Sequence, residues 1–416
     1  SLSRAPAREA LESAARLVIR RHPLLRARLV PGRRAPAFRI GDDDAPDVTW
    51  LSGPVGGPLP ALPPIDLARE NGVRFAVVEG DGAADLVVQW HHVCCDALGI
   101  LAAVHDLLAA WDHAASGAPG EPDLPRLEPE RLRDRGVRVP GLGGFLRLAR
   151  GQLVGLHGVR KFLAREPVPL VPRSPAPPDG PLPPGYPALH GTVLPAGETR
   201  ALREAAIARG VTLHELLTRD LFLGLGDFRK RAAPGEEDRW LRLMVPVSLR
   251  WTDSLRLPAC NLLSCVFLDR RGRDLLDEEA LLDGLHEELD EIRRLDLRLT
   301  FLLSAGLARF LPGGLERQVR ADRSRVSAIF TNAGRLFPGS RLAGEDGFLV
   351  AGGATVREVE LVPPLQPREA ATFCASVYAG RLRLTLHRDS RVIGPGEGEA
   401  LLAAVRLRLA RSAGVA

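Results

Sequence analysis

Two segments in the first part of the chain show the spacing of amphipathic helices. Between Arg8 and Arg20 the apolar residues recur every three or four positions, as on one face of a helix. The segment from Leu98 to His113 has the same pattern. Pro23 disfavours helical geometry just before it. We therefore expect the first helix to end there, with a strand over Leu25–Leu29.

Short apolar runs bounded by turn residues predict strands along the whole chain. These runs lie at 25–29, 37–40, 73–78, 85–90, 189–194, 241–246, 262–268, 327–331, 347–350, 355–361, 371–378 and 382–387. Further helices are expected over 144–164, 197–209, 278–295 and 396–411. Gly210 suits the cap after the helix at 197–209, and Thr212 with Glu215 has capping-box spacing for another. The mixture predicts an α/β (α+β) protein with two similar lobes.

Proline-rich segments mark the expected boundary between the lobes. Composition changes from about 116 to 185, where prolines cluster at 167–169, 175–178 and 181–184. We predict an N-terminal lobe over 1–185, which includes this crossover, and a C-terminal lobe over 186–416. A plain crossover is a better interpretation of Pro175–Pro184 than a partner-binding segment.

Composition excludes several classes of function. Of 416 residues, 45% are apolar and 26% charged, as in ordinary globular proteins. The net charge of +5 is spread among acidic residues, so no nucleic-acid surface is expected. No apolar run reaches 18 residues, so no membrane span is expected, and the first residues do not resemble a signal peptide. Five cysteines, an odd number, favour a reduced, cytoplasmic setting.

The segment His91-His92-Val93-Cys94-Cys95-Asp96 carries the most promising chemistry. It lies between a predicted strand and a predicted helix, where rigid neighbours can hold a catalytic loop. Histidine titrates near neutral pH and can take a proton from a hydroxyl or amine. Because adjacent residues in extended chain face opposite ways, one of the two histidines at most faces a given cavity. Asp96 could fix the loop by pairing with an arginine.

Other interpretations of these and neighbouring residues carry less weight. Cys94 or Cys95 as a nucleophile would need a positive, partly exposed setting. A zinc site built from both histidines and both cysteines lacks the usual ligand spacing. His22 is expected to be a capping or core residue, and His214, in the first turn of a helix, to lie at the surface.

Several segments together resemble the chloramphenicol-acetyltransferase-like superfamily, and within it the condensation domains of nonribosomal peptide synthesis and their free-standing relatives. The family signature His-His-x-x-x-Asp-Gly is similar to the segment from His91 to Ala97. Similar segments of the family stand in the same order at 21–26, 246–250, 260–264 and 378–382.

The resemblance implies a V-shaped pseudo-dimer of two lobes with a tunnel between them, and a stand-alone acyltransferase. His92 would be the general base, with His91 supporting the loop. Asp96 would pair with Arg250, and Thr331 or Asn332 could donate to an oxyanion in the tunnel.

The implied co-substrate is a thioester of coenzyme A or of carrier-protein phosphopantetheine, with no metal and no permanently bound cofactor. An alcohol or amine would accept the acyl group. A monomer is expected.

The sequence departs from the family at three places. Ala97 replaces the motif glycine, which could tighten the channel or exclude a backbone angle that glycine takes easily; Gly99 follows two residues later. The Asp-Phe-Gly-Trp-Gly segment of many relatives has no counterpart. The Asn-Asp pair of the wax-ester-synthase branch is replaced by His214-Glu215.

Two rival hypotheses remain open. A catalytically silent member could bind a carrier protein or recruit a partner enzyme, and Ala97 is the main argument for it. A true condensation domain cut from a larger synthetase is the other. The sequence begins inside the first predicted helix, where relatives carry an earlier strand, so a trimmed N-terminus is also an open interpretation.

Overall fold

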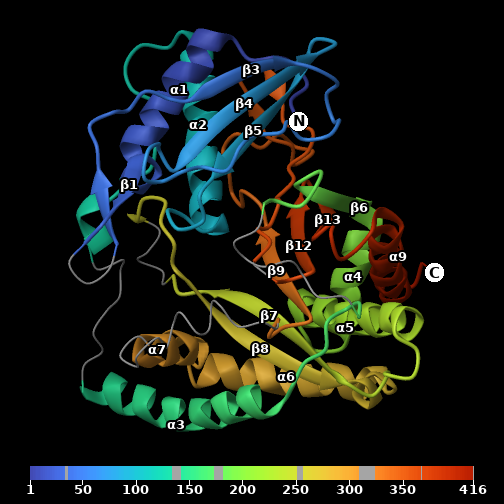
Figure 1. The fold of residues 1–416 in the computed structure, drawn as a ribbon. Coiled ribbons are helices and arrows are strands. Elements are labelled where there is room, and N and C mark those ends of the chain that lie inside the picture. The colour runs from blue at the N-terminus through green and yellow to red at the C-terminus, as the bar shows by residue number, and fades with distance from the viewer. Residues whose placement is uncertain are drawn as a thin grey trace. The chain divides into compact units, whose positions relative to one another are not determined.

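We describe a computed structural model of the chain (Figure 1). It describes residues 1–32, 36–133, 142–172, 181–250, 256–308, 324–366 and 368–415, without the side chains of 142–150, 305, 307 and 308. The Pro175–Pro178 cluster falls outside these ranges. Tertiary contacts divide the chain into two compact units.

The first unit contains Ser1–Arg138, Arg250–Leu263 and Arg335–Val359. Its sheet has the order β3-β4-β5, in which β4 pairs parallel with β3 and antiparallel with β5. A hairpin of β1 and β2, a second of β10 and β11, and the helices α1 and α2 complete it. Its elements are α1 (Arg8–Arg21), η1 (Pro23–Arg26), β1 (Ala27–Val30), β2 (Ala37–Ile40), β3 (Val48–Ser52), β4 (Val73–Gly80), β5 (Ala83–Trp90), α2 (Ala97–Ser116), η2 (Pro129–Arg133), β10 (Val350–Ala351) and β11 (Ala354–Thr355).

The second unit contains Val139–Leu249, Ser264–Gly334 and Glu360–Ala416. Its mixed sheet has the order β6-β13-β12-β9-β7-β8. Its elements are α3 (Leu142–Ala164), β6 (Ala188–Leu194), α4 (Ala196–Ala208), α5 (Leu213–Ala232), β7 (Trp240–Ser248), β8 (Leu263–Arg271), η4 (Gly272–Leu275), α6 (Glu278–Arg294), α7 (Arg298–Ala308), β9 (Ala328–Arg335), β12 (Ala371–Tyr378), β13 (Arg381–Arg388) and α9 (Pro395–Ser412).

Alternation along the strands of the second unit divides its interior into two layers. Leu243 on β7 and Leu268 on β8 belong to the main core, which also contains the apolar faces of α5, α6 and α9. Met244 on β7 belongs to a smaller cluster, against which Cys265 and Phe267 of β8 pack. Because neighbouring residues of a strand face opposite sides, α6 and this smaller cluster lie on opposite faces of the sheet.

The α/β class is confirmed, but the units differ from the continuous division at 185 and 186 that the sequence predicts. Two later segments belong to the first unit because they bond to it. The backbone N–H of Ala259 donates to His22 Nδ1 at 2.8 Å, and the N–H of Gly352 donates to Asp112 Oδ1 at 2.9 Å. The proline-rich composition of the crossover gives no sign of these returns.

Most predicted elements are present, with three differences. A 3₁₀ turn over Pro23–Arg26 replaces the start of the predicted strand at Leu25. The strands expected at 347–350 and 355–361 are reduced to the two-residue β10 and β11. Segment 355–361 makes isolated hydrogen bonds instead, such as that from the N–H of Arg357 to the carbonyl of Ser1. The strand β3 and the helix α7 have no counterpart among the predictions.

Candidate active site

The histidine pair lies at the turn between β5 and α2, as the sequence predicts. The N–H of His91 donates to the carbonyl of Gly72 at 2.9 Å, and the N–H of Cys94 donates to the carbonyl of His91 at 2.9 Å. Both imidazoles are half-buried, whereas Cys94 and Cys95 are fully buried. The turn therefore buries the thiols and leaves both rings partly accessible.

The two histidines have different surroundings. His91 Nδ1 accepts a hydrogen bond from the N–H of Val93 at 3.2 Å, within its own turn. Burial, with the neighbouring His92 adding to it, lowers the pKa of His91, so this ring is neutral near pH 7. His92 instead meets a residue distant in sequence. The amide nitrogen of Asn261 lies 2.9 Å from the carbonyl oxygen of His92 and 3.3 Å from its Nδ1.

Asp96 is the residue that holds this turn in place. One carboxylate oxygen caps α2 by accepting from the N–H of Gly99 at 2.9 Å. The other accepts from Arg250 Nη1 at 2.6 Å and from the N–H of Leu262 at 2.7 Å. Asp96 is 2% exposed. A buried carboxylate with this many donors ties the histidine turn to the returning segment 250–263.

The ion pair between Asp96 and Arg250, which the family resemblance implies, is present. Burial disfavours the charge of Arg250, but the hydrogen bond and the charge of Asp96 outweigh it and raise the pKa of the guanidinium. Arg250 Nη2 also donates to the carbonyl of Cys260 at 2.8 Å. The guanidinium of Arg250 therefore links Asp96 of the histidine turn to Cys260 of the returning segment.

Gly99, rather than Ala97, is the position of this turn where glycine is needed. Ala97 is the first residue of α2 and does not have a positive φ, so this position does not require glycine for its backbone angle. Gly99 is the position where space is short. A Cβ there would lie 2.6 Å from Cys95 Sγ and 3.0 Å from the backbone N and O of Cys260.

The thiols of the motif are poor nucleophiles. Burial, together with the nearby charge of Asp96, raises the pKa of Cys95 well above its usual range. A thiol that stays protonated and out of solvent does not attack a substrate readily. Within the described ranges, no group of three or more histidine, cysteine, aspartate or glutamate side chains has the geometry of a metal site.

Thr331 and Asn332 lie half-buried on β9, in the second unit. Asn332 Oδ1 accepts from the N–H of Gly334 at 2.9 Å, and its amide nitrogen lies 3.4 Å from His214 Nδ1. The expectation that His214 is a surface residue is wrong. Its ring stacks on Phe330, with centroids 5.6 Å apart and planes 9° apart. Burial lowers its pKa.

His22 is a core residue at the end of α1, as expected. It is 1% exposed, and its Nε2 lies 3.3 Å from Asp106 Oδ2. Its Nδ1 accepts from the N–H of Ala259. His22 therefore connects α1, α2 and the returning segment that also carries Asn261. The sequence predicts a similarity to the family at 260–264, but no role for Asn261 was expected; that similarity was the available signal.

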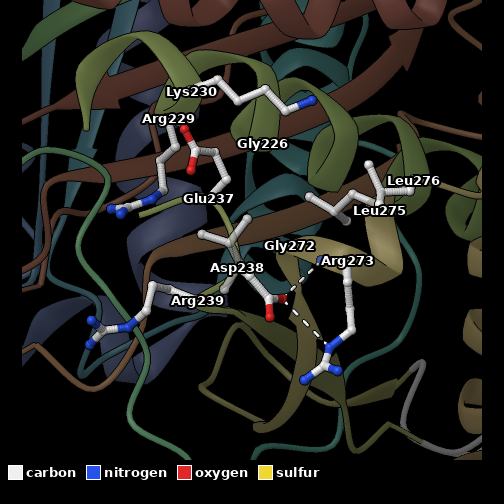
Figure 2. Close-up of a pocket in the computed structure, with 11 residues that line it drawn as sticks. Gly226, Arg229, Lys230, Glu237, Asp238, Arg239, Gly272, Arg273, Leu275 and Leu276 are labelled. Carbon is white, nitrogen blue, oxygen red and sulfur yellow. Dashed lines mark hydrogen bonds and ion pairs between the residues drawn. The ribbon is translucent and has the colours of Figure 1, made fainter. Parts of the chain in front are cut away.

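A separate pocket of about 160 Å³ lies in the second unit, near the end of α5 (Figure 2). It is lined by Gly226, Arg229, Lys230, Glu237, Asp238, Arg239, Leu241, Gly272, Arg273, Leu275 and Leu276. Figure 2 shows Arg273 bonded to Asp238, whose Oδ1 accepts from the backbone N–H of Arg273 at 3.1 Å. The lining contains no histidine, cysteine or serine, and none of the predicted site residues.

The fold defined by these elements is that of condensation domains, as comparison with solved structures shows. The first condensation domain of the calcium-dependent antibiotic synthetase, in complex with a substrate analogue, has a TM-score of 0.67 at 18% identity, over 99% of this chain and 89% of that one. A mutant starter condensation domain of rhizomide synthetase, in complex with C8-CoA, has a TM-score of 0.70 at 16% identity, over 99% and 88%.

The same fold also serves a different reaction class. The epimerization domain from the third module of tyrocidine synthetase B has a TM-score of 0.63 at 14% identity, over 99% of this chain and 91% of that one. At these identities the likeness concerns the fold. The sequence matches no protein-family model and no curated protein. None of the helices in the described ranges is long and apolar enough to cross a bilayer.

Proposed function

We propose that this protein transfers an acyl group from a thioester, of coenzyme A or of carrier-borne phosphopantetheine, to a hydroxyl or amine acceptor. The observation that carries the proposal is the half-buried His92 on a turn fixed by Asp96 and Asn261. The condensation-domain fold supports it, since one such domain was solved with C8-CoA. The solved epimerization domain with this fold makes the site chemistry, rather than the fold, the basis of the proposal.

In the proposed reaction His92 is the general base. The imidazole takes the proton of the acceptor as its oxygen or nitrogen attacks the thioester carbonyl carbon. The resulting oxyanion needs a hydrogen-bond donor, a role that we assign to Thr331 or Asn332. Collapse of the tetrahedral intermediate breaks the carbon–sulfur bond, and the imidazolium returns the proton to the leaving thiolate.

The contact with Asn261 sets a condition on this role. An amide N–H facing Nδ1 favours the neutral ring with its proton on Nε2. If Nε2 is the atom that accepts the proton, the ring must first move its own proton to Nδ1 and lose that 3.3 Å contact. Such a hydrogen bond contributes about 1 kcal/mol, so the competent tautomer remains accessible.

The silent alternative is weakened by the backbone at Ala97. The argument for it was that alanine prevents a backbone angle reserved for glycine, yet Ala97 begins an ordinary helix. Narrowing of a channel by the alanine methyl group is the part of that argument that stands. Acyl transfer therefore remains the better-supported proposal.

The test is acyl transfer by the purified chain and its His92→Ala variant. C8-CoA serves as donor, with a panel of primary amines and alcohols as acceptors, and both thiol release and acylated product are measured. We expect H92A to lose at least about 100-fold in rate, the usual contribution of a general base. His91→Ala is the matched control and should retain most activity. A folded H92A variant with the original rate would refute the role of His92.

A further inference from the structure

Large apolar side chains are exposed in unusual number on α3 and α7. Seven of the nineteen exposed large apolar side chains in the described ranges lie on these two helices. They are Leu153, Val154, Leu156 and Leu163 on α3, and Phe301, Leu302 and Leu303 on α7. Leu153 is 70% exposed and Leu163 is 67% exposed. Single exposed apolar residues are ordinary, whereas a concentration of them marks an interaction site.

The exposed residues of α3 form a stripe along one side of the helix. Leu153, Leu156, Arg160 and Leu163 lie within about 80° of its circumference and span about 15 Å of its length. The opposite side packs on α7 and on the end of α6. A Cβ at Gly155 would lie 2.4 Å from Thr300 Oγ1, and Thr300 donates to Gln152 Oε1 at 2.9 Å. Helix packing therefore accounts for the inner side and leaves the stripe uncovered.

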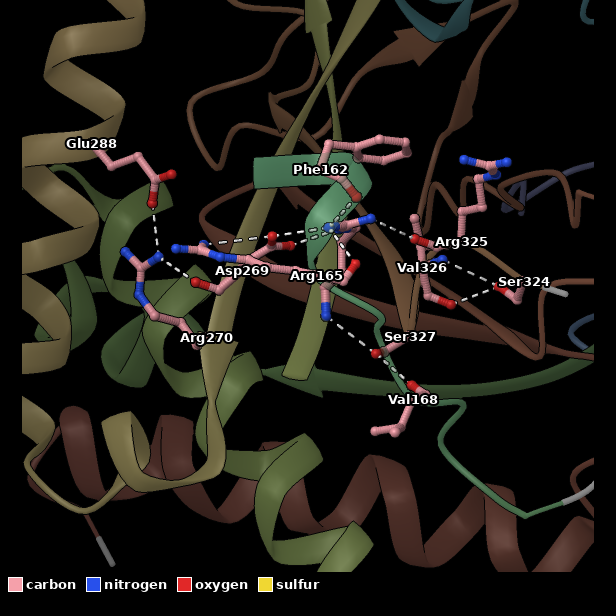
Figure 3. A network of polar contacts seen from close by, with 11 residues as sticks. Phe162, Arg165, Val168, Asp269, Arg270, Glu288, Ser324, Arg325, Val326 and Ser327 are labelled. Atoms are coloured by element: carbon pink, nitrogen blue, oxygen red, sulfur yellow. Dashed lines mark hydrogen bonds and ion pairs between the residues drawn. The ribbon is translucent and has the colours of Figure 1, made fainter. Parts of the chain in front are cut away.

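Arg242 on β7 anchors the C-terminal end of α3 to the sheet. Its guanidinium donates to the carbonyls of Phe162 and Arg165 and pairs with Asp269 of β8, at 2.6 Å. Figure 3 shows Phe162, Arg165 and Asp269 in this network of polar contacts. It also lies over the Phe162 ring, 4.2 Å from the centroid. Carbonyl groups at a helix end are satisfied well by a cation. The stripe is thus presented by a fixed helix.

The two helices that carry these residues contain basic but no acidic side chains, and the exposed Glu166 follows the end of α3. Neither α3 nor α7 contains an aspartate or glutamate, although the chain has 51 acidic residues among 416. The exposed Arg160 and Lys161 flank the leucines of the stripe. The leucines of the acidic helix α6 share the main core, on the other face of the sheet from Phe267 of β8, which contacts Phe162 and Phe301. The end of α6, at Leu295, is the part that reaches α3.

We propose that this surface of α3, made of Leu153, Val154, Leu156 and Leu163 with Arg160 and Lys161, binds the surface of an anionic phospholipid bilayer. Leucines beside basic residues, without carboxylates, are the composition of a helix that lies in the interface plane of a membrane. Long basic side chains can extend toward lipid phosphates while leucines enter the acyl boundary. The exposed stripe is the outer side of a helix rather than a groove, which favours a bilayer over an acidic helical protein. The proposal goes beyond the acyl transfer and does not depend on it.

The experiment is co-sedimentation of the full chain with phospholipid vesicles. Vesicles of phosphatidylcholine alone are compared with vesicles that contain phosphatidylglycerol as well, at low and high salt. We expect binding to the anionic vesicles, weakened by salt. The double variant L153Q/L156Q should bind at least about tenfold less tightly, because two leucines no longer enter the bilayer. The variant R160Q/K161Q should lose affinity for anionic vesicles in particular.

Ile207→Gln is the matched control, since Ile207 on α4 is 76% exposed and lies outside this surface. It should bind as the unchanged protein does, and thermal unfolding of every variant confirms the fold. Absence of binding to anionic vesicles at low salt would overturn the proposal and favour an acidic protein as the partner of this surface. Binding that L153Q/L156Q leaves unchanged would overturn it equally.

Discussion

Two arginine–aspartate pairs, Arg250–Asp96 in the first unit and Arg242–Asp269 in the second, arrange the same chemistry in opposite ways. In the first unit the carboxylate of Asp96 is the centre, with donors from Arg250, Gly99 and Leu262 around it. In the second unit the guanidinium of Arg242 is the centre, surrounded by acceptors. A central carboxylate collects N–H groups, which are free at the start of a helix, and a central guanidinium collects carbonyls, which are free at its end.

The difference shows which pair can bear on chemistry. Asp96 caps the start of α2 directly after the histidine turn, so any shift of Asp96 shifts His92. Arg242 holds the end of α3 through the carbonyl groups of Phe162 and Arg165. Neither of these residues has a titratable ring. Both pairs combine an ion pair with further hydrogen bonds to the backbone. The neighbours, rather than the pair itself, distinguish a functional support from a structural one.

Removal of the central guanidinium should have the largest effect on stability. Arg242→Met keeps much of the side-chain volume but leaves Asp269 and the end of α3 without their donor. We expect a loss of about 3–5 kcal/mol in the free energy of unfolding, as for other broken buried pairs. Denaturant unfolding measures it. The double variant R242M/D269N should recover part of the loss, and acyl transfer per folded molecule should not change. A loss below about 1 kcal/mol would contradict the structural role.

At the other pair, Asp96→Asn should affect both stability and rate. The amide oxygen can still accept from the N–H of Gly99. The amide NH2 group, however, then faces the donors of Arg250 and Leu262, which need an acceptor. We expect a loss of about 2–3 kcal/mol in the free energy of unfolding, the contribution of hydrogen bonds to a charged group. Acyl transfer should fall at least about tenfold because the turn that carries His92 is released. If D96N lost stability but kept its full rate of acyl transfer, the Asp96 pair would be only structural, like the Arg242 pair.

The Asp96–Arg250 pair was predicted from the sequence and the Arg242–Asp269 pair was not, because only the first lies in a local sequence pattern. Asp96 lies in a local pattern of strand, histidine turn and helix, and the family resemblance supplied Arg250. Arg242 lies in a strand whose neighbouring residues are mostly apolar. Its partners Asp269 and Phe162 are 27 and 80 residues away in the sequence. Helix periods and caps, such as Thr212 with Glu215, are local and were predicted correctly. Returns of distant segments, such as 250–263, are not local.

A glycine near each region tests how closely its surroundings are packed. Gly99→Ala places a methyl group against Cys95 and the backbone of Cys260, and we expect a loss of about 1–3 kcal/mol from this overpacking. Gly158→Ala on α3 is the matched control, since nothing lies within 4 Å of its Cβ position. Alanine there should be neutral or stabilise the helix by up to about 1 kcal/mol. Equal effects in thermal unfolding would show that the turn is no more closely packed than the helix surface.

A third buried carboxyl group lacks the arginine that the other two have. Glu369 is 9% exposed, and its Oε2 has no hydrogen-bond partner within the described ranges. Burial raises its pKa from 4.5 to about 8. Between these values the unfolded chain releases the proton and the folded chain keeps it, so stability falls as pH rises through this window and levels off above it.

Glu369→Gln removes this titration and isolates its contribution. Between pH 6 and pH 7.5 the unchanged protein should lose about 1–2 kcal/mol in the free energy of unfolding through this group, given 1.36 kcal/mol for each unit of pH. In E369Q that part of the slope should vanish. The amide has nearly the shape of the protonated acid, so its stability should match the unchanged protein at low pH and exceed it at pH 8. The same pH slope in both proteins would show that Glu369 is ionised when folded, like the two carboxylates that have a guanidinium beside them.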